Sequence, residues 1–281
     1  MSTVLFDTAG PQTRARHRLY SVIASLALLG ILALILWRMY DTDQLAYEKW
    51  EYFVTPDYVT TLLVDGLLET LKMAALAIVF AVVFGLVFGV GKISDHAWAR
   101  WPCWVVVEFF RAVPLLLLIV FIFFTYGTGD GIGSFWSVVI GLTLYNGSVL
   151  AEVFRAGINA VPHGQSEAAY AIGMRKTQVM TIVLLPQAVK IMLPAIISQC
   201  VVALKDTSLG YYVLAPGLTA VGKQIYTEAN NQVQVAIVVA ALYIVSNLVL
   251  TWIATWVQRK YVGEKKLEVF DVGSAGSGAA V

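Results

Sequence analysis

Two acid–base pairs stand inside strongly apolar stretches of this sequence. Glu108 precedes Arg111 by three residues, and Glu152 precedes Arg155 by the same spacing. Residues three apart lie on one face of a helix, so each pair can neutralise its own charge there. We favour structural ion pairs over ligand contact in both cases. The planar guanidinium of Arg111 also matches a carboxylate, which keeps this residue open as a substrate-binding group.

Polar residues also interrupt a later apolar stretch at four consecutive positions: Lys205, Asp206, Thr207 and Ser208. Lys205 and Asp206 are neighbours in sequence, so on a helix they cannot face each other and need separate partners. We interpret this polar segment as part of a pathway or gate, with subunit packing as the alternative. In the preceding apolar stretch, Asn146 and Ser148 are further candidates for lining such a route. Hydrogen bonding between helices explains them at least as well.

Catalysis by this chain finds little support in its sequence. The three histidines, His17, His96 and His163, lie outside the long apolar stretches, so a serine–histidine pair or a histidine-ligated metal cannot form inside them. The two cysteines, Cys103 and Cys200, are too far apart in sequence for a local metal-ligand motif. A net charge of +1 gives no broad basic field for nucleic acid. The sequence therefore predicts no metal site and no nucleic-acid partner.

The elements that must position these side chains follow from composition. Hydrophobic residues make up 59% of the 281 residues and charged residues 13%, whereas soluble domains carry about 45–50% and about 25%. The mean hydropathy is +0.75. Six apolar stretches reach the roughly 20 residues that a helix needs to cross a bilayer: Leu19–Trp37, Gly66–Gly91, Cys103–Tyr126, Phe135–Val153, Ala188–Leu214 and Val233–Val257. We predict an all-α membrane protein with six transmembrane helices.

Lysine and arginine predict how these helices are oriented. If the N-terminus is cytoplasmic, 13 of the 19 basic residues fall in cytoplasmic segments, three fall outside and three lie within spans. Basic residues are in excess on the cytoplasmic side, so both termini are expected there. We divide the chain into a cytoplasmic segment (1–18), a first span with an acidic outer loop (19–65), a transmembrane domain (66–261) and a disordered tail (262–281).

The longest cytoplasmic segment in this arrangement, residues 154–187, contains a short helix of its own. Pro162 and Gly164 interrupt the helix that leaves the membrane. Gln165–Ile172 is predicted to form two helical turns, and Gly173 suits the left-handed position that ends them. So short a helix is marginal in water unless it packs against something. From the residues alone, a docking element for a cytoplasmic partner and a surface connector are equally compatible with it.

A spaced motif lies in the same segment. Its members, in order, are Glu167, Ala168, Ala169, Gly173, Val183, Leu185 and Pro186. This spacing resembles the EAA loop of ABC-importer permeases, in which EAA is followed by three residues, Gly, nine residues, Ile, one residue and Leu-Pro. Val183 replaces the Ile, and every other position matches. The resemblance implies a type I ABC-importer-like permease.

Three further segments resemble the polar amino acid permeases, which serve histidine, arginine, glutamate and glutamine importers. They are Glu108–Leu115, Glu152–Ile158 and Lys205–Leu209. The resemblance covers about residues 66–261, and the N-terminal half most resembles the glutamate permeases of actinobacteria. It implies a multi-pass protein of the bacterial cytoplasmic membrane that transports a polar amino acid, with glutamate or a related one favoured.

The resemblance also implies that this chain is not an enzyme and works with partners. Nothing in the sequence resembles the phosphate-binding Gly-x-x-x-x-Gly-Lys-Ser/Thr motif, so ATP and magnesium would bind to a separate dimer of ATP-binding subunits. The residues implied in docking these subunits are Gly164, Glu167, Ala168, Ala169, Gly173 and Pro186. A second permease, identical or homologous, and an extracytoplasmic binding protein complete the assembly in lipid. A self-sufficient ion-coupled transporter is the alternative, although we find no internal repeat of the kind such transporters usually have.

Overall fold

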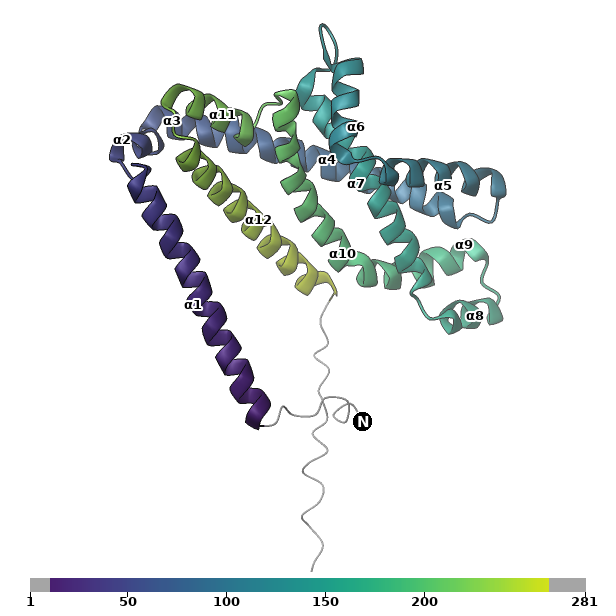
Figure 1. The fold of residues 1–281 in the computed structure, drawn as a ribbon. Coiled ribbons are helices and arrows are strands. Elements are labelled where there is room, and N and C mark those ends of the chain that lie inside the picture. Colours follow the sequence, from purple (N-terminus) through teal and green to yellow (C-terminus); the bar gives the residue numbers. More distant parts are fainter. Residues whose placement is uncertain (1–10, 263–281) are drawn as a thin grey trace, which may run out of the picture. The chain divides into compact units, whose positions relative to one another are not determined.

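The computed structural model describes residues 11–262, and within them all regular secondary structure is helical (Figure 1). This confirms the predicted all-α class. The predicted disordered tail lies outside the described residues from position 263 onwards, as does the start of the predicted N-terminal segment. The chain separates into two compact units, which are described in turn.

The first unit comprises the chain up to Thr60 together with Lys223–Val238. It contains α1 (Pro11–Asp41), α2 (Tyr47–Trp50), η1 (Glu51–Phe53), most of α3 (Pro56–Thr61), most of α11 (Leu218–Ala229) and the start of α12 (Gln232–Val262). Two amides hold it together: Asn231 donates to the carbonyl oxygen of Lys49 at 3.0 Å, and Gln234 donates to that of Gln44. Every side chain from Ala15 to Arg38 is exposed. An apolar helix exposed all round needs lipid as its solvent.

The second unit comprises Thr61–Gly222 and the chain from Val239. Its centre is the crossing of α4 (Glu69–Ile93) with α7 (Gly133–Asn159), and α10 (Leu185–Asp206) packs on α7 as well (Figure 1). Two apolar clusters fill these contacts. One contains Met73, Ile119 and Leu142, and the other contains Leu150 and Met192.

Small residues bring α4 and α7 into close contact. A Cβ added to Gly89 would lie 2.8 Å from the carbonyl oxygen of Ala151, and one added to Gly85 would lie 2.8 Å from Cβ of Leu150. The Gly85-x-x-x-Gly89 spacing is typical of helices that approach closely in membranes. These two glycines therefore mark the place where α4 and α7 approach each other.

The third predicted span, Cys103–Tyr126, is wrong as a single helix. The structure divides it into α5 (Ala97–Ala112) and α6 (Leu115–Ile122) with η3 (Phe123–Gly127), and the two parts are bent by 100°. Pro114 lacks an N–H group and disfavours helical geometry in the residue before it. Val113 is accordingly extended, with φ −77° and ψ 128°. Within residues 11–262, five helices are long and apolar enough to span a membrane, or six if the bent pair forms one broken span.

Two other spans are longer than predicted. The second candidate span runs from Pro56 to Ile93, because α3 continues through the π-helical η2 (Leu62–Leu68) into α4. The fifth runs from Lys176 to Val213 and includes α9 (Lys176–Gln178), the π-helical η4 (Val179–Leu184), α10 and the 3₁₀-helical η5 (Thr207–Val213). The polar segment from Lys205 therefore lies where the helix changes its winding.

Candidate functional site

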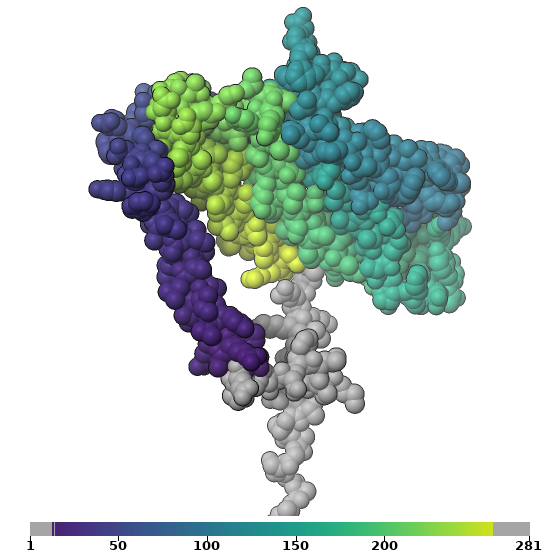
Figure 2. Space-filling view, in the orientation of Figure 1, coloured from purple at the N-terminus to yellow at the C-terminus, as the bar shows by residue number. Residues whose placement is uncertain are grey.

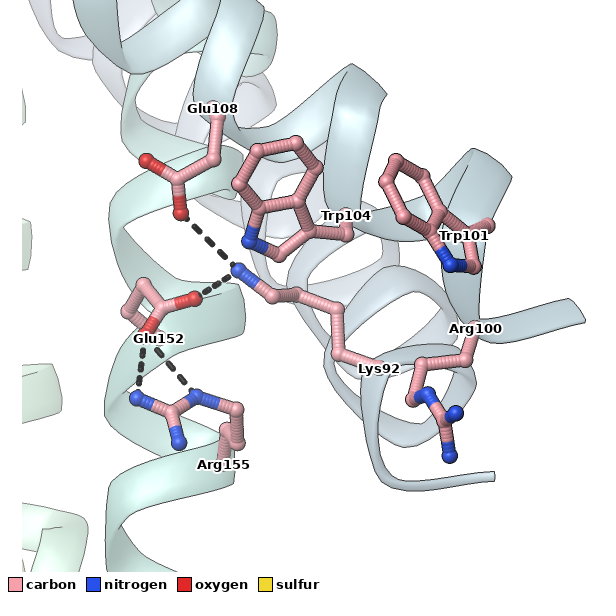
Figure 3. A pocket seen from close by; sticks show the side chains of 7 residues that line it. All are labelled: Lys92, Arg100, Trp101, Trp104, Glu108, Glu152 and Arg155. Carbon is pink, nitrogen blue, oxygen red and sulfur yellow. Dashed lines mark hydrogen bonds and ion pairs between the residues drawn. The ribbon is translucent and has the colours of Figure 1, made fainter. Parts of the chain in front are cut away.

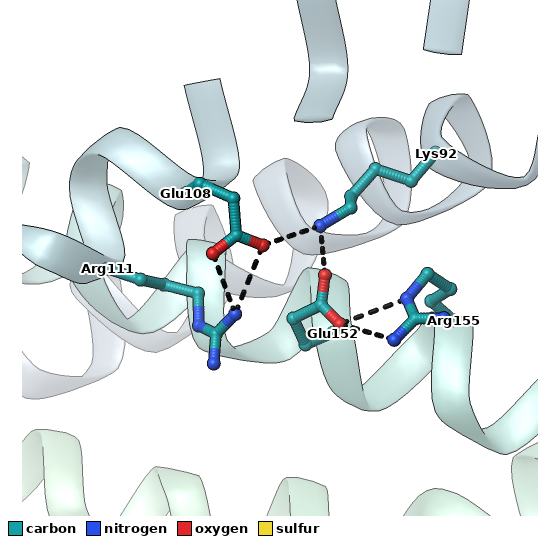
Figure 4. A network of polar contacts seen from close by, with 5 residues as sticks. All are labelled: Lys92, Glu108, Arg111, Glu152 and Arg155. Atoms are coloured by element: carbon teal, nitrogen blue, oxygen red, sulfur yellow. Dashed lines mark hydrogen bonds and ion pairs between the residues drawn. The ribbon is translucent and has the colours of Figure 1, made fainter. Parts of the chain in front are cut away.

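A network of five charged side chains joins α4, α5 and α7 (Figure 4). At its centre, Nζ of Lys92 lies 3.1 Å from Oε1 of Glu108 and also contacts Oε1 of Glu152. Nη1 of Arg111 lies 3.3 Å from Oε1 of Glu108. Nη2 of Arg155 lies 2.9 Å from Oε2 of Glu152. Each carboxylate thus pairs with an arginine on its own helix, and both carboxylates also pair with Lys92.

Lys92 is the member of this network that sequence reasoning missed. From the sequence, Lys92 is counted only among the basic residues of the cytoplasmic segments. In the structure its side chain is buried, with only 5% of its surface exposed. One signal does point to its position. Gly85, Gly89 and Lys92 follow one another at helical spacing, so Lys92 lies on the stripe of α4 that faces α7.

The network has three cations and two anions. An isolated charge at the centre of a bilayer costs about 2.5–3.5 kcal/mol on insertion scales, so charges in membrane helices need partners. Here the partners come from three different helices, and this arrangement fixes α5 against α4 and α7. The geometry suits a structural connection between helices, with one positive charge in excess.

The polar segment from Lys205 contributes to a cavity between α10, η5 and α12. Lys205 and Ser208 line this cavity of about 540 Å³ together with Tyr243, Asn247 and Thr251. Asn247 donates to the carbonyl oxygen of Tyr243 at 2.7 Å, and its buried Oδ1 has no hydrogen-bond partner among the described residues. Sequence reasoning missed the α12 residues, because no local pattern marks them as neighbours of Lys205.

The other two residues of the segment have different surroundings. Thr207 is buried, donates to the carbonyl oxygen of Leu204 at 2.7 Å and lies 3.4 Å from the hydroxyl oxygen of Tyr243. Asp206 ends α10 and is half-buried. Lys205 therefore lines the cavity, whereas Asp206 does not.

Asn146 and Ser148 are engaged within the helix bundle. Both are fully buried. Oδ1 of Asn146 accepts a hydrogen bond from Gln199 on α10, and its Nδ2 donates to the carbonyl oxygen of Leu142 at 3.0 Å. The Ser148 hydroxyl donates to the carbonyl oxygen of Leu144 at 2.7 Å. These contacts favour helix packing over contact with a transported molecule.

The short helix predicted between the fourth and fifth spans is present as α8 (His163–Ala171), at the surface of the second unit (Figure 2). Gly173 has the expected left-handed backbone, with φ +83°. The N–H of Gly173 donates to the carbonyl oxygen of Tyr170, and that of Met174 donates to Ala169 at 3.2 Å, which is the Schellman pattern. Both the helix and its terminating glycine are therefore confirmed.

The motif residues on and around α8 differ in exposure. Ala169 is 5% exposed and packs inward. The exposed members are Gly164, Glu167, Ala168, Gly173 and Pro186. The outer surface of the segment also includes Tyr170 and Ile172, which are 48% and 79% exposed. This is a small, partly apolar surface with one carboxylate.

One ion pair ties this segment to the connection between α4 and α5. Lys176, the first residue of α9, contacts the carboxylate of Asp95. The hydrogen bond and charge of Lys176 hold the pKa of Asp95 below its usual range. The pair therefore keeps its full strength above the ordinary pKa of aspartate and is lost only as acid protonates Asp95.

These features together define a class of protein. Helices of membrane-spanning length are joined by a charge network, and a structured helix lies between two of the spans. Residues 11–262 hold no group of three His, Cys, Asp or Glu side chains that could bind a metal ion. The chain has the architecture of a multi-pass helical membrane protein.

The family follows from comparison with known proteins. Residues 81–263 match the family described as binding-protein-dependent transport system inner membrane component. The chain belongs to this family of ABC transporter permeases, which are non-catalytic subunits of the bacterial inner membrane.

Individual relatives agree with this assignment. The chain is 42% identical over 221 residues to the glutamate transport system permease protein GluD of Corynebacterium glutamicum, covering 77% of this chain and 81% of GluD. It is 32% identical to the arginine transport system permease protein ArtQ of Bacillus subtilis, over 70% of this chain and 91% of ArtQ. A crystal structure of an amino acid ABC transporter with histidines matches with a TM-score of 0.68 and 30% identity, over 74% of this chain and 98% of that one.

Proposed function

We propose that this chain is the permease subunit of an ATP-driven importer for polar amino acids, with glutamate as the favoured substrate. The observation that carries this proposal is the 42% identity to a glutamate permease over most of both chains. The arginine permease relative and the amino acid transporter structure support the wider substrate class. The chain itself performs no ATP hydrolysis.

A separate dimer of ATP-binding subunits docks on α8 and supplies the driving force. The exposed Glu167, Tyr170 and Ile172 support this role, because an apolar surface on a structured cytoplasmic helix suits a protein partner. Gly164, Ala168, Ala169, Gly173 and Pro186 shape the docking element. ATP and magnesium bind to those subunits. Closure of the ATPase dimer moves α8 and switches the spans between inward-open and outward-open states.

The remaining partners complete the path across the membrane. A second permease subunit, identical or homologous, encloses the path, and an extracytoplasmic binding protein delivers the amino acid. Both termini of this chain lie in the cytoplasm. The distribution of lysine and arginine supports this orientation.

Within this chain, Lys205 and Ser208 are the pathway or gate residues that the geometry supports best, because both line a cavity. Glu108 with Arg111 and Glu152 with Arg155 act as structural pairs. The other four polar residues stabilise the helices around the path through packing and hydrogen bonds: Asp206, Thr207, Asn146 and Ser148. Arg111 has a second role only if its guanidinium leaves Glu108 for a substrate carboxylate.

Reconstituted transport tests the proposed function. The permease, purified with the subunits that accompany it, is placed in proteoliposomes with its binding protein and labelled glutamate. We expect uptake that requires ATP and continues when ion gradients are collapsed. Uptake that follows an ion gradient without nucleotide would establish the secondary transporter instead. Competition by unlabelled arginine, histidine and glutamine would then define the substrate range.

Replacing Gly173 with valine should uncouple transport from ATP hydrolysis. A β-branched residue at φ +83° is strained by about 1–2 kcal/mol, which distorts the end of α8. We expect roughly a tenfold fall in amino acids transported per ATP hydrolysed. The control is Gly129→Val, because Gly129 also has positive φ and open space around it but lies in another loop. Normal coupling in Gly173→Val would disprove the docking role of α8.

Replacing Lys205 with methionine should reduce uptake while the protein is still produced. Lys205 is exposed to the cavity between α10 and α12, so its loss changes the path more than the fold. We expect at least a tenfold loss of uptake, with partial recovery in Lys205→Arg. Lys190→Met on the same helix is the control, because Lys190 is exposed and lies outside this cavity. An equal loss of uptake and of membrane-inserted protein would favour the packing explanation.

A further inference from the structure

A cavity with charged walls lies where α4 ends and α5 begins (Figure 3). Its volume is about 520 Å³. Lys92, Glu108 and Glu152 form its inner wall, and Arg155 borders it from α7. Arg100, Trp101 and Trp104 border it from the first half of α5.

Cations exceed anions in this cavity. Its walls carry three basic side chains, Lys92, Arg100 and Arg155, against the carboxylates of Glu108 and Glu152. Those two carboxylates are already paired with Lys92 and with arginines on their own helices. The excess positive charge is therefore available to an incoming anion.

Arg100 is the cation with the most unused hydrogen-bonding capacity. Its guanidinium makes one hydrogen bond among the described residues, from Nη1 to the carbonyl oxygen of Ser94 at 3.4 Å, and interacts with Asp95 only through its charge. Nε and Nη2 of Arg155 both donate hydrogen bonds to Oε2 of Glu152. In Figure 3 the two guanidinium groups lie on opposite sides of Lys92. An anion that enters the cavity can thus be bound by planar N–H donors, which match phosphate geometry.

The two tryptophans that border this cavity indicate where it lies relative to the membrane. Trp101 and Trp104 pack edge to face, with ring centroids 5.7 Å apart, and are 62% and 48% exposed. The second candidate span ends at Ile93, one turn before α5 begins at Ala97, so the indole rings stand at a membrane boundary. Tryptophan is enriched at this depth, where lipid headgroups meet the acyl chains.

We propose that this cavity binds the phosphate headgroup of an anionic phospholipid. Basic pockets between membrane helices bind such headgroups, and the cytoplasmic leaflet is rich in them. The exposed indole rings favour a lipid over a dissolved anion, because they offer an apolar surface for the acyl chains beside the charged wall. Bound lipid would connect α5 to α4 and α7 through Arg100, which the protein's own charge network does not include. This site is separate from the cavity at Lys205, so the inference does not depend on the transported substrate.

Lipid titration of the purified complex tests the proposal. The complex is taken in detergent and titrated with phosphatidylglycerol, with phosphatidylcholine of the same acyl chains, or with inorganic phosphate. Thermal unfolding reports binding, and native mass spectrometry counts the bound lipids. We expect phosphatidylglycerol to raise the Tm at concentrations where phosphatidylcholine and phosphate do not. In Arg100→Gln the apparent Kd for phosphatidylglycerol should rise about fivefold, since a basic residue near the membrane surface contributes about 1 kcal/mol.

Matched variants separate this site from general membrane charge. Lys190→Gln removes an exposed basic residue elsewhere, and Trp98→Ala removes an exposed indole of α5 that does not line the cavity. Both should bind lipid as the unaltered protein does, whereas Trp101→Ala should weaken binding. Equal Tm shifts with the two lipids would overturn the proposal, as would an unchanged Kd in Arg100→Gln. Displacement of phosphatidylglycerol by equimolar inorganic phosphate would overturn the assignment to lipid.

Discussion

Replacing Gly89 with leucine is expected to prevent α4 and α7 from packing. A Cβ at this position meets the carbonyl oxygen of Ala151 at 2.8 Å and Cβ of Phe154 at 3.2 Å. The first of these atoms belongs to the backbone of a helix and cannot rotate away. Overpacking usually costs about 1–3 kcal/mol, and a backbone clash at the central crossing of this unit places Gly89→Leu at about 3 kcal/mol. Thermal unfolding and the yield of folded protein in size-exclusion chromatography measure the loss.

A second glycine provides the control for this experiment. Gly30 lies within α1, and a Cβ added there meets nothing within 4 Å. Leucine favours both helix formation and membrane insertion, so Gly30→Leu should be neutral or slightly stabilising. Gly89→Leu offers the same gains and differs only in the clash. Equal stability of the two variants would mean that α4 and α7 do not approach as closely as the structure describes.

Local features of this chain are predictable from sequence because their causes are local. Apolar stretches of sufficient length predict helices in lipid, and five of them are unbroken candidate spans. Gly173 follows a short helical pattern and takes the left-handed backbone that glycine tolerates best. Gly85 and Gly89 are also interpretable from the sequence, because their spacing on one helix indicates a close neighbouring helix.

The break between α5 and α6 shows where local reasoning is incomplete. Pro114 was visible in the sequence, but proline in a membrane helix is often tolerated because neighbouring groups satisfy the freed backbone. Whether the helix continues or turns depends on the packing on both sides. Here Leu118, Ile119 and Ile122 of α6 are buried and fix the turned direction.

Contacts between distant segments were not predictable from one sequence. Lys92 and Glu152 are 60 positions apart, and the cavity at Lys205 is completed by residues of α12. Two residues can be assigned as a pair only when their spacing fits a single helix, as for Glu108 with Arg111. Long-range partners depend on how the helices cross, which single-sequence patterns do not specify.

Replacing Lys92 with methionine tests the most important of these distant contacts. Methionine is unbranched and nearly as long as lysine but uncharged, so Glu108 and Glu152 lose their shared partner and repel each other. Breaking a buried ion pair costs about 3–5 kcal/mol. Because Arg111 and Arg155 still hold the two carboxylates, we expect a loss near the lower end, about 3 kcal/mol, measured as a fall in Tm and in folded yield.

A control and a rescue decide whether this loss comes from the network. Lys72 pairs with Glu69 on the same helix at 2.6 Å, but its side chain is 50% exposed. Lys72→Met should therefore cost no more than about 0.5 kcal/mol. Glu152→Gln in the Lys92→Met background removes one of the two carboxylates that repel each other and should restore part of the stability, so the two changes should be clearly non-additive. If they are additive, or if Lys92→Met is as mild as Lys72→Met, then Lys92 does not connect α4 to α5 and α7.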